Sequence, residues 1–440
     1  VVTPELKSAG NKLVQFKIAK DEFGLPDYEK VKELYAKITE LMRKGVIVSA
    51  YAEDSYGIAA AAAKMAFGNK LGVKFADGVK AEEFFTNDIA DIVAEVKADA
   101  LADALAVAGS REVGEVTAAA EFSLGGSVVT MDEALDAWKN KLEKVFPSTV
   151  NEEKTKVESS LYKAESVYVC KHKVAKPTVF IPVFPGSNCE YDSAQAFERA
   201  GADVNIRIFR NRNAQDIEES VAEFKKAIEN AQIIMFPGGF SAGDEPDGSA
   251  KFFATAFQNE AIKEAVEDLL NNRDGLALGI CNGFQAMIKL GLVPYGKITG
   301  QNENSPTLTF NTIGRHISKM ATIKVVSNNS PWLQKATLGG VYTNPASHGE
   351  GRFVAPCDVL DQLFANGQIA TQYCDLEGNV TMDDEWNING SYRSVEGILS
   401  PDGRCLGKMA HSERRGDGVA INIFGEQDLK IFESGVEYFR

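Results

Sequence analysis

The chain has 440 residues, 44% of them hydrophobic and 25% charged, and its formal net charge is −15 at pH 7. This composition is typical of a globular protein with two or three domains. The negative charge and the absence of a long apolar run argue against nucleic acid and membranes as partners. The six cysteines are scattered without a C-x-x-C pair, so we expect a reducing, cytoplasmic setting and no structural metal.

The first half of the chain mixes helical and strand patterns. Apolar residues at helical spacing predict a helix over residues 28–43, and an alanine-rich run predicts another over residues 55–67. Asp54 or Ser55 is the expected N-cap of the second helix, because either side chain can accept a hydrogen bond from the first turn. A strand is predicted over residues 89–96.

Turn and cap signals follow in the same half of the chain. Gly125-Gly126 lies between two apolar segments and predicts a β-hairpin. Thr130-x-x-Glu133 predicts a capping box at the start of a helix over residues 132–145. No catalytic constellation is recognisable in this part of the sequence.

The composition changes at a lysine-rich connector before Pro177. We therefore divide the chain into a smaller α+β domain over residues 1–150, a linker over residues 151–176 and an α/β domain over residues 177–440. In the last of these, strand and helix patterns alternate, which predicts a doubly wound, mostly parallel sheet covered by helices on both faces. The predicted strands are residues 178–184, 202–209, 233–236 and 275–280, and the predicted helices are residues 191–200, 217–231 and 249–271.

The most informative stretch is the buried-strand pattern that ends at Cys281. Gly279 and Gly283 flank this cysteine, and a helix is predicted to begin directly after it. The Gly-x-Cys-x-Gly frame is the thiol version of a nucleophile elbow, in which a sharp turn between strand and helix holds the nucleophile above the sheet. A helix N-terminus also favours the thiolate. We therefore interpret Cys281 as a nucleophile and not as an ordinary core cysteine.

A nucleophilic cysteine needs a base that a third group orients. Of the four histidines, His411 fits best, because Glu413 follows two residues later and both side chains project to one side of an extended backbone. A strand-like segment over residues 419–424 follows this pair. His348 lies in a glycine-rich segment that we predict to be a substrate loop and not part of a packed core.

The loops after three predicted strands are expected to meet at one edge of the sheet, because ligands of such sheets bind beyond the carboxyl ends of the strands. These loops contain residues 184–189, residues 237–241 and Cys281. Acyl transfer develops negative charge on a carbonyl oxygen, and backbone N–H groups stabilise it. We predict that Gly239 and Asn282 supply these N–H groups.

Together these motifs resemble the triad-type, class I glutamine amidotransferase family, whose sheet is flavodoxin-like. Residues 185–190, 238–244, 310–315 and 348–352 are similar, more narrowly, to the glutaminase part of phosphoribosylformylglycinamidine synthases. The resemblance covers roughly residues 177–440. It implies catalytic roles for Cys281, His411 and Glu413, and glutamine binding by Gln285, Phe240, His348 and Glu350.

Residues 55–66 and 114–126 resemble the last subdomain of the synthetase region of the same enzymes, which is of the aminoimidazole-ribonucleotide-synthetase type. Because the chain begins at Val1, we expect a carboxyl-terminal fragment of a longer synthase. The resemblance implies glutamine hydrolysis through a cysteine thioester. The ammonia would serve the ATP-dependent conversion of formylglycinamide ribonucleotide to formylglycinamidine ribonucleotide in purine biosynthesis.

The implied partners are L-glutamine, the remaining synthetase region and, in the full enzyme, formylglycinamide ribonucleotide. No cofactor is expected in this chain, whereas ATP and Mg²⁺ are expected in the full-length enzyme. Two other hypotheses remain: another elbow-cysteine hydrolase of similar fold, against which His411-x-Glu413 argues, and a docking scaffold whose glutaminase is silent without the synthetase half. Phe284 departs from the family, which often has a smaller residue there, and we expect it to change the packing behind the thiol.

Overall fold

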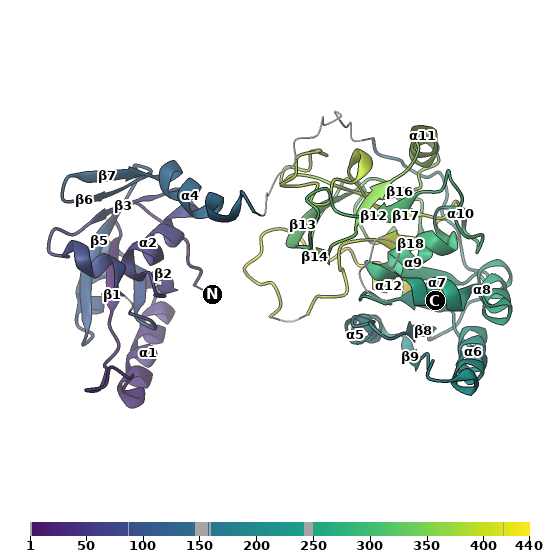
Figure 1. Ribbon diagram of the computed structural model, residues 1–440, viewed down its shortest axis with the longest axis horizontal. Coiled ribbons are helices and arrows are strands. Elements are labelled where there is room, and N and C mark those ends of the chain that lie inside the picture. Colours follow the sequence, from purple (N-terminus) through teal and green to yellow (C-terminus); the bar gives the residue numbers. More distant parts are fainter. Residues whose placement is uncertain (1, 87, 146–156, 158–159, 242–249, 417) are drawn as a thin grey trace. The chain divides into compact units, whose positions relative to one another are not determined.

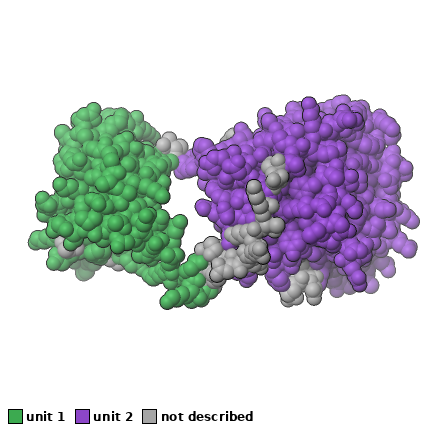
Figure 2. Space-filling model, turned by 90° about the horizontal axis from the view of Figure 1, so that it is seen from above, with its two compact units in different colours: residues 1–147 green, residues 148–440 purple. Residues whose placement is uncertain are grey.

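The computed structural model describes the chain except for residues 1, 87, 146–156, 158–159, 242–249 and 417. The chain forms two compact units, Val1–Pro147 and Ser148–Arg440 (Figure 2). Part of the predicted linker packs on unit 2, since Tyr162 bridges to Ser327 and the Tyr168 hydroxyl donates to Asp274 at 2.7 Å. Within the described residues, every helix lacks the length and apolar character that crossing a membrane requires.

Unit 1 is built on a seven-stranded sheet in the order β2-β4-β1-β5-β3-β6-β7 (Figure 1). Its strands are β1 (Lys12–Phe16), β2 (Ile47–Ala52), β3 (Gly72–Phe75), β4 (Ile92–Val96), β5 (Ser110–Thr117), β6 (Glu121–Leu124) and β7 (Ser127–Thr130). Its α-helices are α1 (Tyr28–Arg43), α2 (Gly57–Phe67), α3 (Leu101–Leu105) and α4 (Met131–Lys139), and its 3₁₀ turns are η1 (Ala81–Phe85), η2 (Ala98–Ala100) and η3 (Asn140–Leu142).

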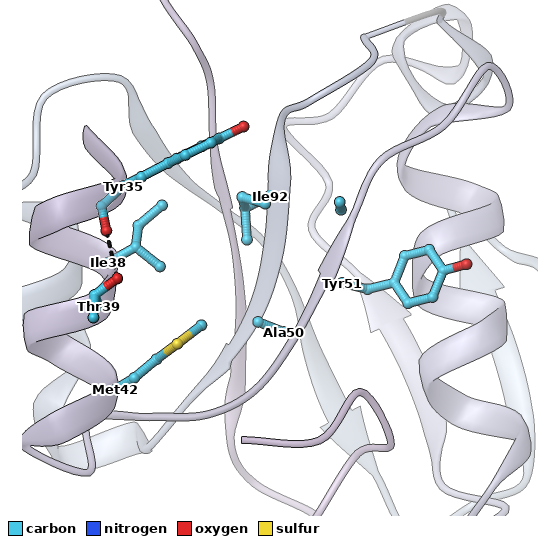
Figure 3. Close-up of a pocket in the computed structure, with 8 residues that line it drawn as sticks. Tyr35, Ile38, Thr39, Met42, Ala50, Tyr51 and Ile92 are labelled. Atoms are coloured by element: carbon cyan, nitrogen blue, oxygen red, sulfur yellow. Dashed lines mark hydrogen bonds between the residues drawn. The ribbon is translucent and has the colours of Figure 1, made fainter. Parts of the chain in front are cut away.

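Successive residues of the strands in unit 1 face opposite sides of the sheet, so the sheet separates two cores. Leu13 packs in the core with α2, whereas Val14 packs in the core with α1. Figure 3 shows the α1 side, where Ile38 points from the helix toward Ile92 on β4. A hollow of about 320 Å³ opens there, lined by Tyr35, Ile38, Thr39, Met42, Ala50, Tyr51, Ala52 and Ile92.

Most predictions for unit 1 are confirmed. Helix α1 has the predicted bounds, and the β6–β7 hairpin and the Thr130–Glu133 capping box are both present. The predicted cap of α2 is wrong, because this helix begins two residues later, after Tyr56, with no side-chain cap. Asp54 instead accepts the Tyr56 N–H at 2.9 Å and pairs with Lys64 at 2.6 Å.

Unit 2 is built on a nine-stranded sheet in the order β14-β13-β16-β17-β18-β11-β10-β8-β9, with a separate two-stranded sheet of β12 and β15. Its strands are β8 (Thr178–Val183), β9 (Asp203–Ile208), β10 (Ile233–Phe236), β11 (Leu276–Ile280), β12 (Thr307–Thr309), β13 (Ile317–Val325), β14 (Val341–His348), β15 (Arg352–Val354), β16 (Ile369–Tyr373), β17 (Val395–Leu399) and β18 (Cys405–Lys408). Its helices are α5 (Glu190–Ala200), α6 (Ala214–Glu229), α7 (Lys251–Phe257), α8 (Glu260–Asn272), α9 (Asn282–Leu290), α10 (Leu292–Tyr295), α11 (Cys357–Ala365) and α12 (Ile431–Glu437), with 3₁₀ turns η4 (Pro331–Leu333) and η5 (Tyr392–Ser394).

The α/β sheet predicted for unit 2 is confirmed, and its parallel part comprises β9, β8, β10, β11 and β18. From β18 onward the pairing is antiparallel, through β17, β16, β13 and β14. Because β8, β10, β11 and β18 run in one direction, the loops that follow them emerge at one edge of the sheet. All of the predicted catalytic residues lie in those loops.

Two elements of unit 2 differ from the prediction. The single helix predicted over residues 249–271 is two helices in the described residues, because Asn259 ends the register of α7 and caps α8 by accepting the Ala261 N–H at 3.0 Å. The strand predicted over residues 419–424 is also wrong, since this segment consists of turns and bends. Its apolar side chains remain outside the core, and Phe424 is 77% exposed.

Candidate active site

Cys281 lies in a strained turn between β11 and α9. Its backbone angles are φ 54° and ψ −110°, a conformation that residues other than glycine rarely adopt. The Cys281 N–H donates to the Lys408 carbonyl at 2.9 Å, which ties the turn to the end of β18. At Gly283, a Cβ atom would lie 1.9 Å from the Phe236 carbonyl oxygen, so the first turn of α9 packs against β10 as only glycine allows.

His411 and Glu413 follow β18, the strand that pairs directly with β11. Both side chains are buried, and His411 Nδ1 hydrogen-bonds to Glu413 Oε1. The His411 N–H donates to the Pro345 carbonyl at 2.7 Å, which fixes the backbone against β14. The other ring nitrogen, Nε2, has no hydrogen-bond partner among the described residues. A carboxylate on one nitrogen and a free second nitrogen are what a general base requires.

The charges around His411 decide its protonation. Burial alone lowers the pKa of His411, but the Glu413 carboxylate and then the Cys281 sulfur outweigh it, and the pKa lies well above its ordinary value. Burial raises the pKa of Glu413, but the facing imidazole outweighs this effect and the pKa lies below its ordinary value. The three side chains therefore stabilise an imidazolium between an anionic carboxylate and the sulfur.

The loop after β10 lies against the nucleophile turn. Gly239 has φ 137°, and a Cβ atom there would lie 2.6 Å from the Gly186 carbonyl oxygen. Ser241 donates both its N–H and its hydroxyl to Asn282 Oδ1, at 3.2 and 2.9 Å. These bonds fix the backbone around Gly239 relative to the residue after Cys281, and these are the two positions predicted to form the oxyanion hole.

Both polar atoms of the Gln285 side-chain amide form hydrogen bonds. It accepts from Asn282 Nδ2 at 2.8 Å and donates to the Glu350 carbonyl at 2.5 Å. Its side chain therefore joins the first turn of α9 to the loop after β14. We expect Gln285 to position the Glu350 loop above the thiol. The Cys281 Sγ lies 3.8 Å from the Ser347 carbonyl oxygen of β14, just before that loop.

His348 is buried, which corrects the expectation that its segment is too rich in glycine to pack. Its Nδ1 lies 3.1 Å from Asn311 Oδ1, and a Cβ atom at Gly351 would lie 2.5 Å from the imidazole. Burial, together with the charges of His411 and His316, lowers the pKa of His348 to about 3. The ring is therefore neutral at pH 7.

Phe240 and Phe284, both near the thiol in sequence or in space, have different surroundings. The Phe240 ring is 38% exposed, and its centroid is 6.3 Å from that of His316. Phe284 is fully buried against β18, where a Cβ atom at Gly407 would lie 2.1 Å from its ring. The large side chain at position 284 is thus accommodated by glycine on the neighbouring strand.

Three side chains at this edge of the sheet were missed by the sequence analysis. Ser241 holds Asn282, and Asn311 binds the His348 carbonyl at 2.8 Å. Cys189, at the start of α5, lies beside His411, and the Arg414 guanidinium donates to its sulfur at 3.1 Å. Ser241 and Cys189 belong to the glycine-rich loops that the sequence singled out, so proximity to those loops was the available signal.

Comparisons with known proteins match the part of the chain that contains this site. Residues 176–439 match the family model of the CobB/CobQ-like glutamine amidotransferase domain. The phosphoribosylformylglycinamidine synthase subunit PurQ of Methanococcus maripaludis is 35% identical over 281 residues, which cover 60% of this chain and 97% of that protein. The protein of the same name from Chlorobium chlorochromatii is 33% identical over 257 residues, covering 58% of this chain and 95% of the relative.

Among solved structures, a chain of PurLQS from Thermotoga maritima is 28% identical to this chain, with a TM-score of 0.43. The match covers 60% of the present chain and 100% of the Thermotoga chain.

Proposed function

Because the chain belongs to the CobB/CobQ-like glutamine amidotransferase family, we propose that unit 2 hydrolyses glutamine at Cys281 and supplies ammonia for the synthesis of formylglycinamidine ribonucleotide. The observation that carries the proposal is the placement of Cys281, on a strained turn after β11, beside a buried His411–Glu413 pair after the adjacent β18. The names of the relatives support the choice of purine synthesis over other amide transfers.

In the proposed reaction the Cys281 sulfur attacks the carboxamide carbon of glutamine. The carbon–nitrogen bond breaks, and the leaving ammonia takes a proton from the His411 imidazolium. Water then adds to the thioester, with His411 accepting its proton, and glutamate leaves as the sulfur is released. The Gly239 and Asn282 N–H groups are assigned to the oxyanion, where one such donor is worth roughly 3 kcal/mol.

Phe240, His348, Glu350 and Gln285 are assigned to glutamine recognition, directly or by positioning the loop after β14. ATP, Mg²⁺ and formylglycinamide ribonucleotide are assigned to the synthetase region that receives the ammonia. Unit 1 is assigned to that region on its sequence resemblance. A cytoplasmic location agrees with the six cysteines, all of which are free.

The test is to measure glutamate and ammonia released from glutamine by the purified chain, with and without the synthetase partner. A diazoketone analogue of glutamine should alkylate one thiol, and peptide mapping should identify it as Cys281. Labelling of Cys281 with stimulation by the partner is the expected result. A chain that is neither labelled nor able to release glutamate in the presence of the partner would favour the scaffold hypothesis and contradict the proposal.

A further inference from the structure

A second thiol lies beside the catalytic histidine, on an element that the proposed reaction does not use. Cys189 is 1% exposed and precedes α5, after the loop that follows β8. A Cβ atom placed on Gly238 would lie 2.9 Å from Cys189 Sγ and 3.0 Å from His411 Cε1, so sulfur and imidazole flank the same point. The Cys189 thiol also contributes to the raised pKa of His411.

Cys189, His411 and Glu413 each bring one ligand atom to within 4.8 Å of the others, and all three residues are buried. Two of these buried groups have an unsatisfied atom: His411 Nε2 and Glu413 Oε2 have no hydrogen-bond partner among the described residues. Zinc–ligand bonds are about 2.0–2.3 Å long, so the ligand atoms around one ion lie roughly 3–4 Å apart. Shifts of about 1 Å would therefore be enough to form a shared site.

We propose that Cys189, His411 and Glu413 form an inhibitory site for a thiol-seeking divalent cation, with Zn²⁺ as the ion that fits best. Thiolate, imidazole and carboxylate together are a zinc donor set, whereas Mg²⁺ and Ca²⁺ prefer oxygen ligands alone. On binding, the Cys189 thiol loses its proton and the ring nitrogen bound to the metal carries none, so protons are released to solvent. The Arg414 guanidinium, at 3.1 Å from the sulfur, orients Cys189.

A hollow in unit 2 lies beside these ligands. Its volume is about 720 Å³, and it is lined by Glu413 together with Asp192, Gln195, Arg199, Arg414, Arg415, Gly416 and Val419. The Glu413 side chain itself is fully buried, so an ion that enters this hollow from the side of α5 reaches the ligands only when the residues around Glu413 move apart.

The consequence for catalysis rests on the proposed function. A metal ion on His411 prevents the ring from taking up and delivering protons, so the cysteine keeps its thiol but loses its base. The inhibition would be reversible by a chelator. Unlike oxidation or alkylation of the nucleophile, it leaves Cys281 chemically unchanged.

The test measures metal binding separately from activity. The purified chain is titrated with Zn²⁺ against a chromophoric chelator, and with Cd²⁺ while the ultraviolet band of the cadmium–thiolate bond is followed. We expect about one tight Zn²⁺ per chain, competed by Cd²⁺ and not by Mg²⁺. Cys189→Ala should weaken Zn²⁺ binding by at least about tenfold. Removing a residue that only hydrogen-bonds to a metal ligand already lowers metal affinity by about that factor, and Cys189 is a proposed ligand itself. It should also remove the cadmium–thiolate band.

Two further variants act as controls. Cys357→Ala removes an exposed thiol on α11 and should bind Zn²⁺ like the parent chain. Cys281→Ala should also retain the site, since the nucleophile is not one of the proposed ligands. In assays of glutamine hydrolysis, Zn²⁺ should inhibit the parent chain and Cys357→Ala. The rate of Cys189→Ala with Zn²⁺ should equal its rate without Zn²⁺.

The proposal is overturned if the parent chain binds no Zn²⁺, if Cys189→Ala binds it as tightly as the parent, or if Cys281→Ala abolishes the cadmium–thiolate band. Melting temperatures of each variant, with Cys189→Ser as a second replacement, separate loss of a ligand from loss of the fold. Because the titrations need no turnover, a chain that is neither labelled nor active with its partner would contradict the proposed function and still give a result for the metal site.

Discussion

The two units bury ionisable side chains in different ways. In unit 2 the buried charges near the active site face opposite charges: His411 faces Glu413, and Lys408 Nζ lies 3.4 Å from Glu396 Oε1. In unit 1 two buried carboxylates lie near each other with an amide between them. Gln15 Nε2 donates to Glu53 Oε1 at 2.6 Å and lies 3.5 Å from Asp91 Oδ2.

This difference shows in the protonation of the two units. In unit 2 the pairing keeps Glu413 ionised, because the imidazolium favours its anionic form. In unit 1 burial, together with the neighbouring Asp91 charge, raises the pKa of Glu53 from 4.5 to about 7, although the Gln15 hydrogen bond opposes the rise. Burial without an opposite charge makes a carboxylate titrate near neutrality, and burial with one preserves the charge that a reaction uses.

The strongest test of the paired site in unit 2 is removal of the nucleophile. Cys281→Ala should abolish glutamine-dependent synthesis in the assembled enzyme, by at least about a thousandfold, because no thioester can form. Synthesis from added ammonia should persist. Steady-state rates with each nitrogen source measure both effects, and Cys357→Ala is the matched exposed-thiol control. Normal glutamine turnover by Cys281→Ala would contradict the assignment.

The base and its carboxylate should act as one unit with the thiol. His411→Ala should lower the glutaminase rate by about a thousandfold, and Glu413→Gln by about a hundredfold, because an amide still accepts a hydrogen bond but does not stabilise an imidazolium. The double variant of Cys281 and His411 should be no slower than Cys281→Ala alone. If His411→Ala forms the thioester at the parent rate, another base operates.

A third variant breaks the pairing beneath the site. Lys408 also donates to the Ala410 carbonyl, and Glu396 accepts the Ala410 N–H at 2.7 Å, so the pair holds the residue before His411. Lys408→Met should lower the free energy of unfolding of unit 2 by about 3–5 kcal/mol, because it leaves a buried carboxylate unpaired. Urea denaturation measures the loss. Adding Glu396→Gln should recover most of it, and absence of recovery would show that the effect is not due to charge.

Glu53, the buried carboxylate of unit 1 that lies near Asp91, should have the smallest effect, a pH-dependent change in the free energy of unfolding of unit 1. The pKa of Glu53 is higher in the folded state than the 4.5 of an ordinary glutamate, so folded unit 1 binds the extra proton between pH 4.5 and about 7. This proton stabilises folded unit 1 by about 3 kcal/mol below pH 4.5, and the stabilisation is lost as the pH rises through about 7. Pulsed hydrogen exchange in urea, read on peptides of β1 and β4, measures this slope.

Glu53→Gln should remove that pH dependence and make unit 1 more stable than the parent at pH 8, because the amide carries no charge to bury. The exposed Glu22→Gln is the matched control and should leave the slope unchanged. A parent slope that survives Glu53→Gln would assign the titration to Asp91 or to another group.

The sequence predicted what is encoded locally. The periodic apolar residues of α1, the Thr130–Glu133 capping box and the Gly-x-Cys-x-Gly elbow each lie within one segment, and all three are found. The break between α7 and α8 was missed because good helix formers flank Asn259 on both sides. The segment over residues 419–424 has a strand-like alternation, but no neighbouring strand pairs with it.

Contacts between distant segments were outside the reach of sequence patterns. Cys189 is 222 positions before His411 along the chain, and only the parallel arrangement of β8 and β18 in one sheet brings them together. The antiparallel part of the sheet was missed for a similar reason, since its strands are joined by connections of very different kinds, including helix α11 between β15 and β16 and only five residues between β17 and β18. The sequence therefore identified the reacting groups, and the fold was needed to find what surrounds them.

The pairing of β11 with β18 also sets the distance between the two reacting side chains. Ile280 on β11 lies opposite Lys408 on β18. The nucleophile Cys281 is the residue after Ile280, and the base His411 is three residues after Lys408. Adjacent strands are about 4.8 Å apart, and sliding one past the other by a single residue moves its end by about 3.3 Å. The separation of thiol and imidazole is thus set by main-chain hydrogen bonds in the interior of the sheet. Loops at the rim can change to admit other substrates while this spacing stays constant.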